Sequence, residues 1–148
     1  MTIRTLFTRL LAPLIILYAV PAFATNRALT ISAPPAAQPG ASVHVTVTAS
    51  TDATDGEQIA FFQSEYSMDS GKTWIPVYAE KVGRSATRSV DFQAGEEGSK
   101  ALVRVRIAFR GGKAGDVDFS GAPIAWGGSW GKWTTPPAKS AVISVTAR

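Results

Sequence analysis

From residue 25 onward, apolar and polar residues alternate along several short stretches of the chain. Between Ser42 and Ala49, valine and alanine take every second position, and serine, histidine and threonine take the positions between them. Lys100 to Arg110 alternates in the same way, with apolar residues from Val103 to Phe109 on one side and Arg104, Arg106 and Arg110 on the other. A period of two is typical of a strand with one buried face. No stretch here has the 3.6-residue period of an amphipathic helix, so we expect strands only.

Less regular runs predict five further strands: Arg27 to Ser32, Gln58 to Tyr66, Thr73 to Tyr78, Val82 to Phe92 and Ala141 to Ala147. Prolines at 34, 35 and 39 follow the first run, which makes it an edge strand. The run from Val82 is irregular, because Arg84 and Arg88 share the side of its apolar residues; a bulge or misplaced ends would explain this. About seven short strands separated by turn residues predict an all-β, antiparallel, two-sheet sandwich.

The clearest turn lies between Tyr66 and Trp74, where Ser67 begins the pattern S-x-D-x-G-x-T-W. Asp69 can accept hydrogen bonds from nearby backbone N–H groups, and Gly71 can adopt a positive φ. Aromatic and aliphatic residues flank the turn on both sides. We therefore expect a β-hairpin in which Asp69 caps the turn and Trp74 packs onto the core.

The order of the expected strands resembles that of immunoglobulin-like and fibronectin type III-like domains. Pro39 to Val47 is similar to their second strand, and the hairpin from Tyr66 to Trp74 is similar to the turn between their third and fourth strands. The chain departs from the family in two ways: it has no cysteine for the usual disulfide, and Phe109 stands where a tyrosine is expected. The resemblance implies an immunoglobulin-like sandwich over residues 25–148.

The hairpin motif also resembles the Asp-box of sialidases and related β-propellers, in which it recurs once per blade. This chain has one copy, and the 124 residues after position 24 are too few to close a propeller. Single Asp-box-like hairpins also occur in immunoglobulin-like domains attached to bacterial enzymes. The resemblance therefore implies a structural turn rather than a sialidase site.

Residues 1–24 have the features of a cleaved signal peptide. Arg4 and Arg9 precede an apolar run from Leu10 to Val20, and Ala22-Phe23-Ala24 is a small-x-small cleavage site. The run is shorter than the roughly 20 residues that a membrane span needs, so we expect no span in the mature chain. We expect an exported protein, in a bacterial periplasm or secreted to the cell surface.

Composition narrows the possible functions. The chain has no cysteine, which excludes a disulfide framework, a catalytic thiol and a cysteine-ligated metal. Removing residues 1–24 leaves 13 basic and 11 acidic residues and no basic tail, so nucleic acid is not an expected partner. His44 is the single histidine, and no acid lies near it along the sequence. No catalytic motif is present, and we expect a protein that is not an enzyme.

The segment from Gly111 to Pro137 is far longer than the loop of about 2–5 residues that usually joins two strands of a hairpin. It is rich in aromatic residues, which argues against disorder. Exposed indole rings stack on sugars or on partner side chains, so this loop is the candidate ligand site. The alternative is that its rings fold back and close the open end of the sandwich. The candidate residues are Phe119, Trp126, Trp130 and Trp133.

The expected topology brings the loop after the second strand to the same end of the sandwich as this long loop. Five acidic residues then gather there and could hold a calcium ion, although solvated loop acids are commoner. They are Asp52, Asp55, Glu57, Asp116 and Asp118. We expect no other cofactor.

The outward arginines of the Lys100 to Arg110 strand form a basic stripe. It is either a solvated face, balanced by acids such as Glu65 or Asp91, or a docking surface for an acidic partner. Taken together, the sequence predicts an exported, non-catalytic binding or accessory module that binds a glycan through its tryptophan loop. The alternative is a protein–protein interaction or self-association module serving another exported protein.

Overall fold

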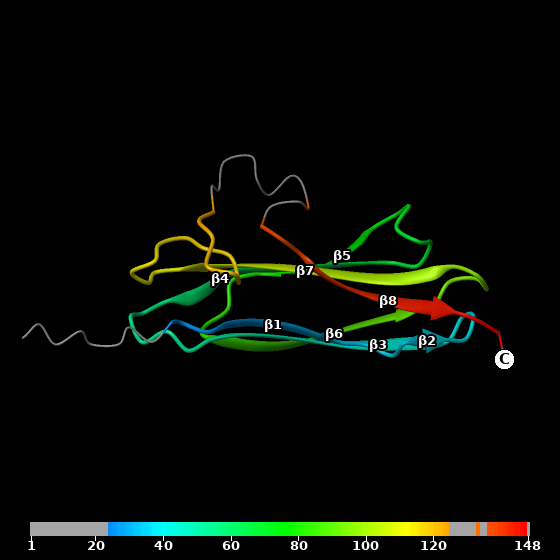
Figure 1. The fold of residues 1–148 in the computed structure, drawn as a ribbon. Coiled ribbons are helices and arrows are strands. Elements are labelled where there is room, and N and C mark those ends of the chain that lie inside the picture. The colour runs from blue at the N-terminus through cyan, green and yellow to red at the C-terminus, as the bar shows by residue number, and fades with distance from the viewer. Residues whose placement is uncertain (1–23, 125–132, 134–135, 148) are drawn as a thin grey trace, which may run out of the picture.

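A computed structural model describes residues 24–124, 133 and 136–147. Their strands form two layers, a three-stranded and a five-stranded sheet (Figure 1). The three-stranded sheet has the order β1 (Arg27–Ser32), β3 (Ser42–Thr51), β6 (Ser85–Gln93). The five-stranded sheet has the order β2 (Ala36–Ala37), β8 (Lys139–Val145), β7 (Lys100–Arg110), β4 (Gln58–Ser67), β5 (Ile75–Glu80). The predicted all-β, two-sheet sandwich is confirmed.

The first part of the chain is divided between the two sheets. β1 pairs antiparallel with β3 along its whole length, as an edge strand. After the prolines at 34 and 35 the chain crosses over, and β2 pairs parallel with the last two residues of β8. The prolines predict the end of the β1 pairing but not the crossing to the other sheet, because a proline ends one pairing without indicating where the next begins.

The core between the sheets follows the predicted alternation. All four apolar positions of β3, from Val43 to Ala49, are at most 1% exposed, and the inward residues of β7, from Val103 to Phe109, are fully buried. Tyr66 of β4 stacks on Phe92 of β6, with ring centroids 4.6 Å apart, and so links the two sheets. β3 and β6 expose the residues between their buried positions, so the three-stranded sheet keeps a separate outer face, whereas residues 105–109 of β7 are buried on both sides of the strand.

The outer face of the three-stranded sheet carries mainly hydroxyl groups. Thr30, Thr48 and Thr87 lie directly opposite one another on β1, β3 and β6. The hydroxyls of Thr48 and Thr87 are 3.3 Å apart, within hydrogen-bonding distance. Such cross-strand threonine pairs stabilise a sheet that faces water.

The irregular pattern of the run predicted from Val82 to Phe92 comes from misplaced strand ends, not from a bulge. β6 begins at Ser85, so Arg84 lies before it, and its register with β3 is continuous. Arg88 does share the inward side with Ala86 and Val90, but it reaches the edge of the sandwich, where its Nε donates to Glu80 at 2.6 Å. A long side chain at an edge can carry its charge to solvent, so alternation alone overestimates its burial.

The hydrogen bonds of the turn after β4 confirm that Asp69 caps it. The Ser67 hydroxyl donates to Asp69 at 2.8 Å and accepts the Gly71 N–H at 2.8 Å. The Thr73 N–H donates to Asp69 at 2.9 Å, and Gly71 has φ 85°. The expectation that Trp74 packs onto the core is wrong: its ring contacts Arg104 on the outer face of the five-stranded sheet.

Asp69 should make the stability of this hairpin depend on pH. The Thr73 hydroxyl and N–H, together with Ser67, lower the pKa of Asp69 to about 2, against about 3.9 in an unfolded chain. The charged carboxylate therefore stabilises the fold above about pH 4, and this contribution is lost as the pH falls through about 2.

We predict that Asp69→Ala lowers the Tm by a few degrees at pH 7, because the turn loses its cap. The difference from the unsubstituted protein should narrow as the pH falls from about 4 to about 2. Thermal unfolding followed by circular dichroism across this range measures it. Glu97→Ala, in an exposed turn, is the matched control. A Tm difference that stays constant with pH would contradict the predicted role of the carboxylate.

Candidate functional site

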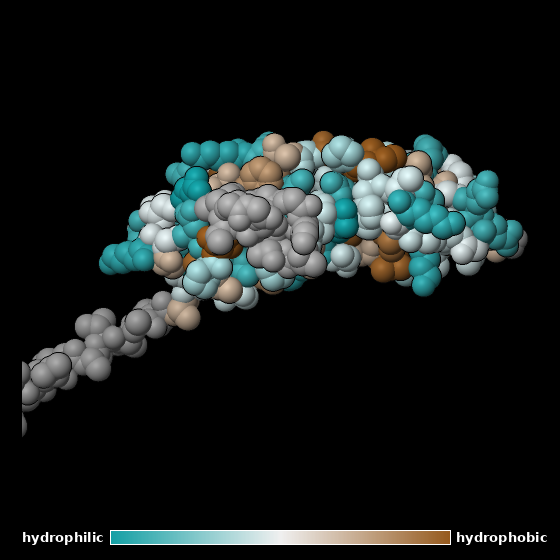
Figure 2. All heavy atoms as spheres, turned by 90° about the horizontal axis from the view of Figure 1, so that it is seen from above, coloured by the Kyte–Doolittle hydropathy of each residue, from teal (hydrophilic) through white to brown (hydrophobic). Residues whose placement is uncertain are grey.

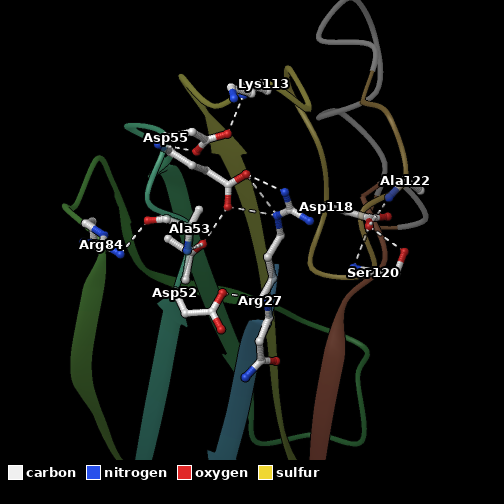
Figure 3. Close-up of polar contacts among 12 residues, drawn as sticks. Arg27, Asp52, Ala53, Asp55, Arg84, Lys113, Asp118, Ser120 and Ala122 are labelled. Atoms are coloured by element: carbon white, nitrogen blue, oxygen red, sulfur yellow. Dashed lines mark hydrogen bonds and ion pairs between the residues drawn. The ribbon is translucent and has the colours of Figure 1, made fainter. Parts of the chain in front are cut away.

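The loop between β3 and β4 touches the loop that follows β7, as the predicted topology requires (Figure 3). The Lys113 N–H donates to the Asp55 carboxylate at 2.7 Å. A Cβ on Gly112 would lie 2.8 Å from the Asp55 Oδ1, so glycine is needed for the two loops to approach this closely. Two segments separated by more than fifty residues are thus joined at this end of the sandwich.

Glu57 is fully buried at the centre of this end. Its carboxylate accepts hydrogen bonds from the Arg27 Nε at 2.9 Å and Nη2 at 2.6 Å, and from the Thr51 hydroxyl at 2.7 Å. The forked contact with Arg27 ties the start of β1 to the loop before β4. Glu57 is a structural ion-pair partner and is not presented to a ligand.

The other four acids also have local partners. The Asp52 carboxylate accepts the Asn26 N–H at 2.7 Å, and Asp116 pairs with Arg110 at 2.9 Å. The buried Asp118 accepts N–H groups from Ser120 and Ala122, as Figure 3 shows. The Lys113 N–H is the main cause of a lowered pKa of Asp55.

Among the residues that the structure describes, no group of three or more acidic, histidine or cysteine side chains is placed to hold a metal ion. The five acids instead act as acceptors that fix the loops. The calcium site therefore stays a prediction of the sequence and gains no support from this geometry.

We predict that Glu57→Gln lowers the free energy of unfolding by about 3–5 kcal/mol, because it leaves the charge of Arg27 without a counter-ion in a buried site. Urea unfolding at pH 7 measures this. Asp52→Asn, at an exposed carboxylate, is the control and should cost less than about 1 kcal/mol. Equal losses for the two variants would show that the Glu57 charge contributes nothing beyond packing.

A second cluster lies on the outer face of the five-stranded sheet, around Arg104 of β7. The Arg104 Cζ is 3.7 Å from the Trp74 ring centroid and 4.1 Å from that of Trp133. Its Nη2 is also 2.6 Å from the Glu65 carboxylate, the acid that the sequence predicted as a balancing charge. A guanidinium can stack on rings and pair with a carboxylate at once, because its donors lie in its plane.

Arg106 continues this cluster toward the middle of the sheet. The expectation that it faces solvent is wrong: the residue is 1% exposed, because Trp133 lies 4.5 Å above its Cζ and Gln63 accepts from its Nε at 2.7 Å. Burial lowers the pKa of Arg106 from its ordinary value. The predicted basic stripe is therefore largely covered or ion-paired within the chain.

Trp133 lies in neither of the two places considered from sequence. It covers the outer face of β7 beside Trp74, away from the acidic loops and from the open end of the sandwich. Phe119 packs against the core, with the Lys139 Nζ 5.2 Å from its ring centroid, so it is not displayed as a ligand contact. Trp126 and Trp130 lie outside the described residues.

A groove of about 460 Å³ lies on the outer face over β7 and β8, and this cluster forms part of its lining. Its walls are mainly apolar and come from Trp74, Leu102, Arg104, Trp133, Pro137, Ala138, Ser140 and Val142. Val142 is 55% exposed, and the other large exposed apolar side chains in the described ranges, Ile75 and Val77, belong to the same sheet. Seen from this side, apolar patches lie among polar side chains (Figure 2).

His44 has an acidic neighbour that the sequence analysis missed. Asp91, opposite it on β6, lies 2.6 Å from its Nδ1, and the Thr46 hydroxyl is 3.4 Å from its Nε2. The register of β3 with β6, which sequence alone did not fix, creates this pair. Both side chains are about 60% exposed on an open sheet face, so the group lacks the shielding from water that sites of proton transfer usually have.

Comparison with known protein families and with curated proteins finds no match to this chain. Over the stretches that the structure describes, no helix is long and apolar enough to cross a membrane.

We predict a coupling free energy of about 0.5–2 kcal/mol between Trp74 and Arg104, measured by urea unfolding of Trp74→Leu, Arg104→Met and the double variant. The stacked contact is lost once in each single variant, so the double variant should lose less than the two losses together. Trp74 and Arg88 form the control pair, because Arg88 belongs to the other sheet and its effects should simply add. Additive losses for Trp74 and Arg104 would contradict a stabilising stack.

Proposed function

We propose that this chain is an exported, non-catalytic interaction module that docks a protein partner on the outer face of its five-stranded sheet. Export is supported by the signal-peptide features of residues 1–24. Asn26, two residues beyond the expected cleavage site, already donates its N–H to Asp52, so cleavage after Ala24 would leave this contact in place. The partner would be another exported protein.

We further propose that the sandwich is of the immunoglobulin-like type. The division of the first strand supports this, because one half pairs with β3 and the other with β8 of the opposite sheet. The placement of β4, β7 and β8 as neighbours in one sheet, facing β3 and β6 in the other, agrees with the third, sixth and seventh strands of that fold facing the second and fifth.

The groove on the outer face over β7 and β8 is the observation that carries the functional proposal. Exposed apolar side chains that gather in a concave surface are typical of sites where protein side chains dock. Val142 projects beside this groove with more than half of its surface open to solvent. Leu102, its cross-strand neighbour on β7, and Trp74 also line the groove.

Two features favour a protein partner over a sugar at this site. The Trp133 ring already contacts two guanidinium groups, so its π surface is less available for stacking on a sugar ring. The groove walls are mostly aliphatic or aromatic, with Arg104 and Ser140 as the polar exceptions, whereas a sugar needs many hydrogen-bonding groups.

We predict that Val142→Asp abolishes co-purification of a specific exported protein with the tagged, mature chain and leaves the Tm within a few degrees. The carboxylate would place an unpaired charge in the groove. Thr87→Asp, on the outer face of the other sheet, is the control and should retain the partner.

A parallel titration of tryptophan fluorescence with a glycan panel tests the alternative. No change is expected. Quenching by one sugar, lost on simultaneous alanine substitution of Trp126, Trp130 and Trp133, would contradict the proposal and favour the carbohydrate-binding alternative. Loss of the partner with both aspartate variants would show that the outer face of the five-stranded sheet is not the docking surface.

A further inference from the structure

We propose that the free edge of β8, between Lys139 and Ile143, accepts an extended segment of the partner protein as an added strand. This inference rests on the proposed function and specifies how the partner is held. It assigns affinity to main-chain hydrogen bonds along the edge and selectivity to the adjacent groove, as in other strand-addition complexes.

The hydrogen bonds of β8 show which of its backbone groups face the edge. Ser144 donates its N–H to Pro35, on the β2 side, at 3.1 Å, whereas Val145 donates to Ser99, on the β7 side, at 3.1 Å. Backbone groups alternate in this way along an antiparallel strand. The register with β7 is continuous from Lys139 to Ser144, so Ser140 and Val142 direct their N–H and carbonyl groups toward the β2 side.

β2 does not reach these groups. It pairs with Ser144 and Val145 and no further, because the chain before it belongs to the other sheet, where β1 pairs with β3. Within the described residues no strand pairs with the edge at Ser140 and Val142. The backbone N–H and carbonyl groups of Ser140 and Val142 therefore continue the same edge of β8 that pairs with β2 at Ser144 and Val145.

The side chains next to the edge define the chemistry of the added strand. A strand beside β8 would place every second side chain on the outer face, and the one directly opposite Val142 would lie about 5 Å from it. Val142 and Ser140 line the apolar groove that Leu102 and Trp74 also border, so an aliphatic side chain is favoured at that position.

A positively charged side chain, Lys100, lies near this apolar position on the outer face. Lys100 lies opposite Ser144 on β7, on the same outer side as Leu102, and is exposed. No carboxylate in the described chain forms an ion pair with it. The added strand would end where β2 begins, beside Ser144, so the partner segment would carry alternating aliphatic residues and, just beyond its paired part, an acidic residue whose side chain reaches across β8 toward Lys100.

The test uses the mature protein and a blocked heptapeptide of alternating valine and threonine that ends in aspartate. Binding is measured by isothermal titration and by hydrogen exchange of the Ser140 and Val142 amides. We expect binding that protects both amides, and about tenfold weaker binding for the same peptide with lysine in place of aspartate.

Two substitutions at one position separate the edge from the groove. Val142→Pro keeps an apolar side chain but removes an N–H that faces away from β7, so it should fold and weaken binding about tenfold or more. Val142→Ala keeps the N–H and should weaken binding less. If Val142→Pro does not fold, amide protection in the unsubstituted protein still decides.

Binding without protection of these amides, or binding unchanged in a folded Val142→Pro variant, would overturn the edge proposal. So would failure of the peptide to bind at millimolar concentration. A molecular mass that rises with concentration, and falls back in Val142→Pro, would identify a second copy of this chain as the occupant and overturn the assignment to another protein. In each of these cases, a partner lost in Val142→Asp but kept in Thr87→Asp would leave the proposed function standing.

Discussion

The Arg104 guanidinium is the point at which three distant parts of the chain meet. Trp74 reaches it from the hairpin that follows β4, and Trp133 reaches it from the long loop that follows β7. Glu65 neutralises the charge within the plane of the guanidinium, so the stack needs no outside counter-ion. The adjoining groove depends on this arrangement, because both indole rings form part of its lining. A lysine could provide the charge but not the flat surface.

The strands and the turn could be predicted from sequence because their causes are local. A period of two marks β3 and β7, and Ser67, Asp69 and Gly71 bond to one another across a few residues. The burial of Arg106 could not be predicted, because it depends on a ring from a segment 27 residues further on in the sequence. The position of Trp133 could not be predicted for the same reason, because it depends on contacts with residues far away in the sequence. Alternation tells which side of a sheet a residue faces, but not what covers that side.

The acidic residues in the β3–β4 loop and in the loop after β7 were candidates for metal binding because the sequence shows the carboxylates but not the groups that donate hydrogen bonds to them. The structure supplies those donors from the chain itself: a guanidinium for Glu57, and backbone N–H groups for Asp55 and Asp118. Buried polar groups must find partners, and here the loops satisfy one another. The end with the most charged residues is thus mainly structural, and the more apolar outer face is the better candidate for binding.

The row of Thr30, Thr48 and Thr87 gives the molecule two unlike sides. One broad side presents small hydroxyls that water satisfies readily, whereas the other presents indoles, aliphatic groups and a hollow. Such asymmetry gives the sandwich a preferred orientation wherever it meets a less polar surface. Of two identical copies brought together at random, most encounters would involve at least one hydroxyl side and would separate again. A face of hydroxyl groups offers little apolar area to bury, so contacts made through it would be weak.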